Sequence, residues 1–217
     1  MLISAGLAAL ALTWLVFNPL YQKGLPGRLK RNHLGIKAIP TTIAALFAAA
    51  AFFLFGGDRY SLLIFIGLAV CTAADVMLGI KFIVGGVLFF SGHILYLTAL
   101  GGYHSPTWWS LLVFALAVPA LWLFCRQYAE KIPGKLLFAG VLLYSTALGA
   151  LLAFSLPLPF LAPSRRSIFA ALGAVLFVLS DMGTCHCILT KTSGRFDYIS
   201  LGIYYSAQIF LGMSAFV

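Results

Sequence analysis

Eight stretches of about 20 mostly apolar residues follow one another along this chain, separated only by short connections. Their ranges are 2–20, 37–55, 60–80, 82–101, 108–124, 135–156, 167–190 and 197–217. A helix of about 20 residues spans the hydrocarbon core of a bilayer. A closed barrel also satisfies its backbone in lipid, but these runs are too long for barrel strands and lack their alternation. The sequence therefore predicts an all-α fold, a polytopic membrane helix bundle with about eight transmembrane helices.

The composition agrees with lipid as the solvent of this chain. Hydrophobic residues make up 62% and charged residues 9% of the 217 positions, and the mean hydropathy is +1.04. A soluble domain carries about 25% charged residues because its surface faces water. Little sequence remains between the apolar stretches, so we expect residues 1–217 to form a single integral-membrane domain in contact with the lipid bilayer.

The basic residues are distributed unevenly between the two sets of connections. In a soluble protein the net charge of +9 would indicate nucleic acid, but here its placement indicates topology. Eleven of the 14 basic residues fall in alternate connections, at 21–37, 81, 126–135 and 191–195. The positive-inside rule places these in the cytoplasm. We therefore expect no nucleic acid partner, and we predict a multi-pass protein of the cell inner membrane with both termini outside.

The N-terminal part of the chain has two features that require interpretation. The first apolar stretch has no basic region before it and no small-residue cleavage site, so we interpret it as a retained helix and not as a signal peptide. The connection 21–36 contains four basic residues: Lys23, Arg28, Lys30 and Arg31. These residues either contact anionic headgroups or only determine the topology.

The cysteines do not indicate disulfides or a metal site. All four, Cys71, Cys125, Cys185 and Cys187, fall within or at the end of predicted helices. The sequence Cys185-His186-Cys187 resembles a metal cluster, but adjacent residues on a helix point in different directions. A zinc site needs four converging ligands, usually from more than one element. We interpret these residues as small packing residues and expect neither a metal nor a cofactor.

Two aspartates, Asp75 and Asp181, interrupt the apolar stretches. An ionisable side chain in the middle of a membrane helix costs about 2.5 to 3.5 kcal/mol even on the lenient insertion scale, so each implies an interior position and a task. The other acids, Asp58, Glu130 and Asp197, lie in or beside connections. At 1.5 Å per residue, Asp75 lies about 8 Å and Asp181 about 14 Å from the cytoplasmic helix ends. The candidate site is therefore in the cytoplasmic half of the membrane.

Other polar residues of the apolar stretches belong to the same candidate site: Lys37, His93, Tyr96, Tyr204 and Gln208. His93 and Tyr96 share one helix face because they are three residues apart, and Tyr204 and Gln208, four apart, share another. Each has two interpretations. A buried His or Tyr often serves as a hydrogen-bond partner between helices, and Lys37, at the start of its apolar stretch, either binds a ligand or marks the membrane boundary.

Two carboxylates close together in a low-dielectric site hold one proton between them, so that one acts as acid and the other as base. This chemistry suits hydrolysis of an acid-labile bond. The chain has no Gly-x-Ser-x-Gly elbow and no His-Glu-x-x-His pair. The residues alone therefore leave two interpretations open, an acid/base hydrolase and a proton-coupled transporter.

A transporter of this kind often contains an inverted repeat or matched broken helices, and neither is evident in the sequence. An intramembrane aspartyl protease is a second alternative, since it also uses two membrane aspartates. It is expected to carry Gly-x-Gly-Asp at one of them, whereas this chain has Thr72-Ala73-Ala74-Asp75 and Val178-Leu179-Ser180-Asp181.

The order of several short motifs resembles the YhhN-like lysoplasmalogenase family over roughly residues 37–210. The motifs are Lys37-Ala38-Ile39-Pro40-Thr41-Thr42, Gly67-Leu68 through Asp75, Gly85-Gly86 through His93 and Tyr96, Phe177-Val178-Leu179-Ser180-Asp181, and Tyr204 or Tyr205 before Gln208. The resemblance implies an eight-helix membrane enzyme that acts on a lysophospholipid substrate. Such an enzyme hydrolyses the vinyl ether bond of lysoplasmalogens to a fatty aldehyde and glycerophosphoethanolamine or glycerophosphocholine.

The resemblance also gives the polar residues expected roles. Asp75 and Asp181 would be the catalytic pair, one protonating the vinyl carbon and the other stabilising the resulting cation and orienting water. Lys37 would hold the lipid phosphate as a point charge. The remaining polar residues would orient water or the headgroup: His93, Tyr96, Tyr204 and Gln208.

Overall fold

The computed structural model describes residues 2–23, 31–192 and 194–216, and its regular secondary structure in these ranges is helical. The elements are α1 (Leu2–Leu12), the π-helical turn η1 (Thr13–Phe17), α2 (Asn18–Lys23), α3 (Arg31–Leu54), α4 (Arg59–Ile80), α5 (Phe82–Tyr103), α6 (Trp108–Arg126), the 3-10 turn η2 (Ala129–Lys131), α7 (Lys135–Ser155), α8 (Leu158–Leu161), α9 (Arg165–Thr190) and α10 (Arg195–Ser214). Seven helical segments of the described chain are long and apolar enough to cross a membrane, and α1, η1 and α2 together supply the first of them. The all-α multi-pass bundle is therefore confirmed.

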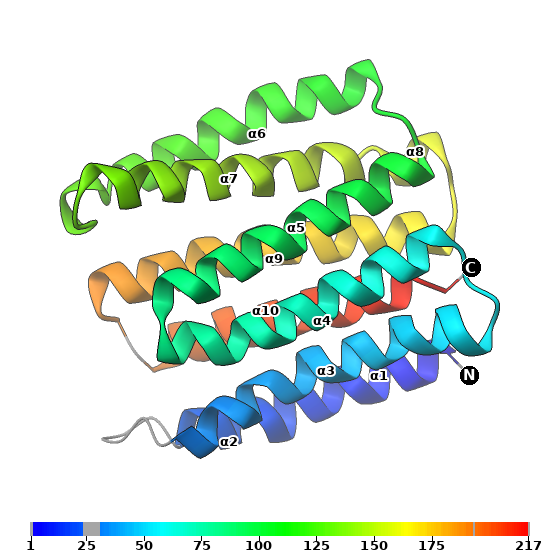
Figure 1. Ribbon diagram of the computed structural model, residues 1–217, viewed down its shortest axis with the longest axis horizontal. Helices are drawn as coiled ribbons and strands as arrows, with labels where there is room; N and C mark the ends of the chain where they lie inside the picture. The colour runs from blue at the N-terminus through cyan, green and yellow to red at the C-terminus, as the bar shows by residue number, and fades with distance from the viewer. Residues whose placement is uncertain (1, 24–30, 193, 217) are drawn as a thin grey trace.

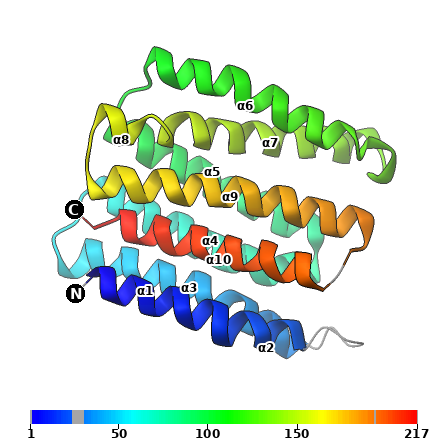
Figure 2. The ribbon, with the colours of Figure 1, turned by 180° about the vertical axis from the view of Figure 1, so that it is seen from behind.

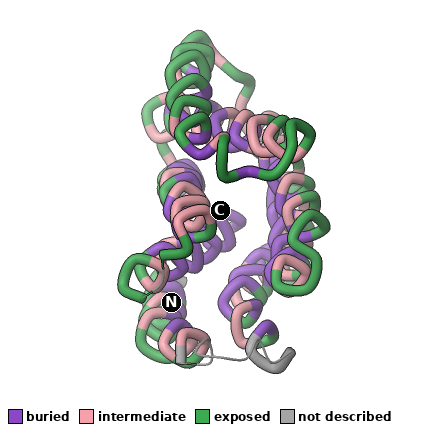
Figure 3. The backbone as a smooth tube through the Cα atoms, turned by 90° about the vertical axis from the view of Figure 1, so that its left-hand side faces the viewer, coloured by how far each residue is buried: buried purple, intermediate pink, exposed green. Residues whose placement is uncertain are grey.

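The long helices run side by side in two layers that share one edge (Figures 1 and 2). One layer contains α3, α4 and α5, and the other contains α1, α10 and α9. Helix α7 packs on both α5 and α9 at the edge of the two layers, whereas α6 packs almost entirely on α7. Seen along the helices, the buried residues face the space between the layers, and exposed residues cover the outside (Figure 3).

Helix α10 is the eighth long helix, and it lies inside the bundle. It packs on α9 and α3 and also contacts α1 and α4. Residues 204–209 are all buried, including Tyr204, Tyr205 and Gln208. The neighbouring helices shield α10 from lipid, so it needs less hydropathy than a helix that contacts lipid. This burial explains how a helix with several polar residues belongs to a membrane bundle.

Successive connections alternate between the two ends of the bundle. The end of α2, the start of α3, Lys81, the connection 127–134 and the end of α9 lie at one end of the bundle, which we call the basic end. The start of α1 and the end of α10 lie at the opposite end (Figure 1). The first and last described residues, 2 and 216, therefore lie at the same end of the bundle. That both termini face the outside of the membrane stays a prediction from charge. The side chains of Lys23, Arg28, Lys30 and Arg31 lie outside the described residues.

At the end opposite the basic end, a buried arginine ties several helices together. Arg166 of α9 donates to both carboxylate oxygens of Asp58, at 2.6 and 3.3 Å. Asp58 also caps α4 by accepting from the backbone N–H of Ser61. The guanidinium lies over the rings of Tyr60 and Tyr103, with distances of 4.5 and 5.2 Å to their centroids. A bidentate ion pair between two aromatic faces fixes α9 against α4 and α5.

This ion pair predicts a pH-dependent contribution to stability. Burial raises the pKa of Asp58, but the hydrogen bonds and charge of Arg166 and the hydrogen bonds from Ser61 together lower it by more. The pKa of Asp58 therefore lies below the ordinary 3.8. The folded protein therefore binds fewer protons here than the unfolded chain, and stability rises with pH through this window. We expect wild type to melt above Asp58→Asn at neutral pH, with the difference disappearing as the pH falls below about 4. Thermal unfolding of both proteins in detergent across pH measures this, and a constant difference would contradict it.

Candidate active site

Asp75 is fully buried in the interior of the bundle and is surrounded by donors from two helices, α3 and α10. Its Oδ2 accepts from the Thr41 hydroxyl of α3 at 2.7 Å and from the Tyr204 hydroxyl of α10 at 2.8 Å. Its Oδ1 lies 3.4 Å from the Lys37 Nζ of α3, and 13% of that lysine side chain is exposed. A charge buried in this way needs a partner and hydrogen bonds. Lys37, Thr41 and Tyr204 supply both.

The hydrogen bonds continue from Asp75 through α10 to α5. The Gln208 Nε2 donates to the Tyr204 hydroxyl oxygen at 3.0 Å, and the Tyr96 hydroxyl donates to the Gln208 Oε1 at 3.2 Å. All three side chains are buried. The structure therefore brings together four residues predicted for the site besides Asp75 itself: Lys37, Tyr96, Tyr204 and Gln208.

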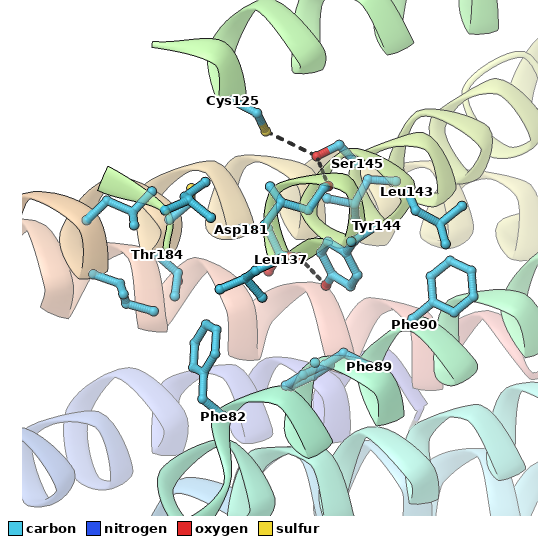
Figure 4. Close-up of a pocket in the computed structure, with 18 of the residues that line it drawn as sticks. Phe82, Phe89, Phe90, Cys125, Leu137, Leu143, Tyr144, Ser145, Asp181 and Thr184 are labelled. Carbon is cyan, nitrogen blue, oxygen red and sulfur yellow. Dashed lines mark hydrogen bonds between the residues drawn. The ribbon is translucent and has the colours of Figure 1, made fainter. Parts of the chain in front are cut away.

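Asp181 has a different environment from Asp75. Its Oδ2 accepts from the Tyr144 hydroxyl of α7 at 2.5 Å. No cation pairs with Asp181 among the residues that the structure describes. Asp181 is a partly exposed residue and lines a cavity (Figure 4).

The cavity has a volume of about 560 Å³ and lies between the end of α4 and helices α5, α6, α7 and α9. Its walls are mostly apolar, with Phe82, Phe89 and Phe90 on α5 and Leu137 and Leu143 on α7 (Figure 4). Its polar wall groups include Asp181, Tyr144 and a contact between Cys125 and Ser145, whose Sγ and Oγ atoms lie 3.2 Å apart. Such a cavity suits an apolar ligand with one reactive group held near Asp181.

A series of ring contacts runs from Tyr204, the partner of Asp75, to Tyr144, the partner of Asp181. Phe177 packs against Tyr204 on the Asp75 side, with ring centroids 5.6 Å apart, and against His93, at 4.6 Å. His93 packs in turn against Tyr144, at 5.3 Å. Within the described ranges, no hydrogen bond joins the two carboxylates through a shared partner, and Asp75 is not part of the cavity wall. Direct action as a pair stays a prediction.

His93, whose ring contacts both Phe177 and Tyr144, is fully buried. Its Nδ1 lies 2.6 Å from the Phe89 carbonyl oxygen, which only accepts, so Nδ1 carries a proton. In the neutral ring, Nε2 is then an acceptor, and it has no hydrogen-bond partner among the described residues. This acceptor fits the predicted role of His93 in orienting water or a substrate hydroxyl, which stays a prediction.

The structure corrects the predicted position of Lys37. The sequence placed it at the beginning of the second membrane helix, whereas α3 begins at Arg31, so Lys37 lies inside the helix. The chain before residue 37 contains polar residues and Gly35, which lowered its hydropathy without preventing helix formation. This position brings the ammonium group to Asp75.

Two contributors to the site were missed at the sequence level, Thr41 and Tyr144. Thr41 belongs to the quoted motif after Lys37, and its spacing of four residues from Lys37 places both on one helix face. Tyr144 gave no comparable signal, because it is an uncharged residue without a second polar residue of the predicted site on its helix. The residues Cys185, His186 and Cys187 have different surroundings: Cys185 lines the cavity, His186 lies 2.7 Å from the Tyr128 hydroxyl, and Cys187 is buried.

Comparison with known proteins gives one match. The model of the YhhN family matches residues 32–215, which cover most of the chain and include all seven predicted site residues. No curated protein and no solved structure matches the chain. The matched region extends from α3 to the end of α10 and contains both aspartates and the cavity. The chain belongs to the YhhN family.

Proposed function

We propose that this protein hydrolyses the vinyl ether bond of lysoplasmenyl phospholipids, releasing a fatty aldehyde and glycerophosphoethanolamine or glycerophosphocholine. The observation that carries the proposal is the Asp181 carboxyl in the wall of a mostly apolar cavity within a membrane bundle. Membership of the YhhN family, which is associated with lysoplasmalogenase activity, supports it. The cavity volume of about 560 Å³ lies in the range of small-molecule sites.

Asp181 is the proton donor in this proposal. An apolar wall without a cationic partner favours the neutral carboxyl group. Tyr144 donates to Oδ2, which leaves the other oxygen to carry the proton toward the cavity. Protonation forms a C–H bond at the vinyl carbon remote from the ether oxygen and uses the π electrons of the double bond. The product is an oxocarbenium ion, with Asp181 left as carboxylate.

Asp75 supports the second half of the reaction. Three donors, Lys37, Thr41 and Tyr204, surround its carboxylate and favour the charged form. A water molecule adds to the oxocarbenium carbon, and in this proposal its proton passes to a carboxylate, Asp75 or the newly formed Asp181 carboxylate. The hemiacetal then loses its glycerol oxygen as an alcohol and becomes the aldehyde. The resemblance implied that Lys37 holds the lipid phosphate. Its ion pair with Asp75 supports a different role in this proposal, in which the ammonium group balances the charge of the Asp75 carboxylate.

The experiment compares two lysophospholipids with the same headgroup and chain, one with a vinyl ether and one with a saturated ether. Purified protein in detergent is expected to release aldehyde from the vinyl ether alone, because the saturated ether has no carbon that an acid can protonate. A coupled aldehyde dehydrogenase assay measures the product. Absence of aldehyde from the vinyl ether would contradict the proposal.

The chain of hydrogen bonds from Tyr96 to Asp75 is also the kind of arrangement that conducts protons, which keeps a proton-coupled transporter as the alternative. The same protein in liposomes with an internal pH dye distinguishes the two. A hydrolase is expected to release aldehyde without moving protons across the membrane. Proton flux on imposing a gradient, without aldehyde release, would favour the transporter.

A further inference from the structure

We propose that Gly86 of α5 and Gly140 of α7 set the width of the cavity and determine which hydrocarbon chains it accepts. This inference rests on the proposed function for the identity of the ligand, a lysophospholipid with one long unbranched chain. It concerns the part of the cavity that holds the chain, and it assigns no role in the chemistry to either glycine.

Both glycines line the cavity, and neither is required by packing. A Cβ added to Gly86 or Gly140 would meet no atom within 4 Å. Other glycines of the same two helices differ: a Cβ at Gly85 would collide with Leu78, and a Cβ at Gly149 would collide with Val118. Close helix packing therefore explains Gly85 and Gly149 but not Gly86 and Gly140.

Glycine within a helix is destabilising relative to alanine, because it loses more backbone freedom on folding. At Gly86 and Gly140 no gain in packing offsets this cost. What the missing side chains provide is empty volume in the cavity wall. The positions of the two glycines on different helices mean that they widen the cavity from two sides.

The cavity reaches the lipid-facing surface of the bundle near these glycines. Ile83 and Val87 of α5 line the cavity and yet are 65% and 59% exposed, and Leu143 of α7 is 58% exposed. Helix α6 leaves this side open because it packs almost entirely on α7. A hydrocarbon chain can therefore enter sideways from the bilayer, past Gly86 and Gly140, to reach Asp181.

The occupant is a single hydrocarbon chain for three reasons. The wall is mostly apolar, the opening faces lipid, and the reactive Asp181 lies in the same wall. A leucine side chain at either glycine would extend into the space that such a chain needs. A hydrophobic pocket discriminates by about 10- to 200-fold for one methylene group, so the larger leucine is expected to have a clear effect on long chains.

The experiment uses Gly86→Leu and Gly140→Leu, with Gly102→Leu as the matched control. Gly102 also lies on α5, also has open space at its Cβ, and is not part of the cavity wall. We expect kcat/KM for a long-chain lysoplasmenyl phosphocholine to fall at least about tenfold in both cavity variants. For a short-chain analogue we expect little change, and Gly102→Leu should resemble wild type with both substrates. Gly86→Ala and Gly140→Ala, which fold at least as easily, should give smaller losses.

A second measurement does not depend on catalysis. A lysophosphocholine with a diazirine in its chain is expected to label peptides of α5 and α7 in wild type and Gly102→Leu, and to label them several-fold less in Gly86→Leu and Gly140→Leu. Equal labelling and equal chain selectivity in all variants would overturn the inference. Labelling that is lost in the cavity variants while wild type releases no aldehyde would contradict the proposed reaction and support the role of the glycines.

Discussion

Replacement of Asp181 by asparagine is expected to lower the rate of aldehyde release by about 100- to 10,000-fold, the usual contribution of a general acid. The amide keeps the size of the carboxyl and can still accept from Tyr144, but it cannot donate a proton to carbon. Binding of the substrate chain in the mostly apolar cavity should persist. The measurement is kcat and KM for a lysoplasmenyl phospholipid, with a large fall in kcat and little change in KM.

Two further variants test whether the fall in the rate of aldehyde release is specific to loss of the Asp181 carboxyl group. Glu130→Gln removes a carboxylate from the connection between α6 and α7, at an exposed position outside the cavity wall, and is expected to match wild type. Tyr144→Phe removes the hydrogen bond to Asp181 but keeps the acid, so its loss should be smaller than that of Asp181→Asn. Full activity of Asp181→Asn would exclude Asp181 as the proton donor.

Removal of the Lys37 charge is expected to destabilise the fold by about 3 to 5 kcal/mol. Lys37→Met keeps an unbranched apolar side chain, one atom shorter than lysine, and removes the cation that pairs with the Asp75 carboxylate. The cost is that of an uncompensated buried charge, and it exceeds the net contribution of the ion pair itself. Reversible unfolding in mixed micelles measures the free energy, compared with Lys135→Met, an exposed lysine at the start of α7.

The double variant Lys37→Met, Asp75→Asn separates the two contributions. When both charges are absent, no charge remains unpaired, so the double variant should be more stable than Lys37→Met alone. Its aldehyde release should stay low, because Asp75 is also missing. Strictly additive losses of stability in the two single variants and the double variant would show that Lys37 and Asp75 do not interact energetically.

Much of the fold follows from properties that each segment carries by itself. Hydropathy over about 20 residues depends on the local sequence alone, so it located the long helices to within a few residues. The largest difference was at α3, which begins at Arg31 because polar residues near a membrane interface join a helix without raising its hydropathy. Alternation of basic connections is likewise a local property, and it gave the two ends of the bundle.

The candidate site was only partly predictable. Asp75 and Asp181 were found because a carboxyl group in an apolar stretch is costly wherever the stretch packs. Tyr204 was also found as a site residue, but its contact with Asp75 was not predicted, and Tyr144, the partner of Asp181, was missed. These contacts join distant parts of the chain: Tyr204 lies 129 positions from Asp75, and Tyr144 lies 37 positions from Asp181. A resemblance between motifs also gave no indication of the cavity, whose walls come from five helices.

By itself, the sequence determined that this chain is a multi-pass helical membrane protein with two costly carboxyl groups in its interior. The tertiary structure decided that Asp75 is surrounded by Lys37, Thr41 and Tyr204, whereas Asp181 lies with Tyr144 in the wall of a mostly apolar cavity. The physical reason for this division is that the hydropathy of a segment depends only on the residues of that segment. The surroundings of a side chain depend instead on how neighbouring helices are rotated and packed, which no single segment encodes.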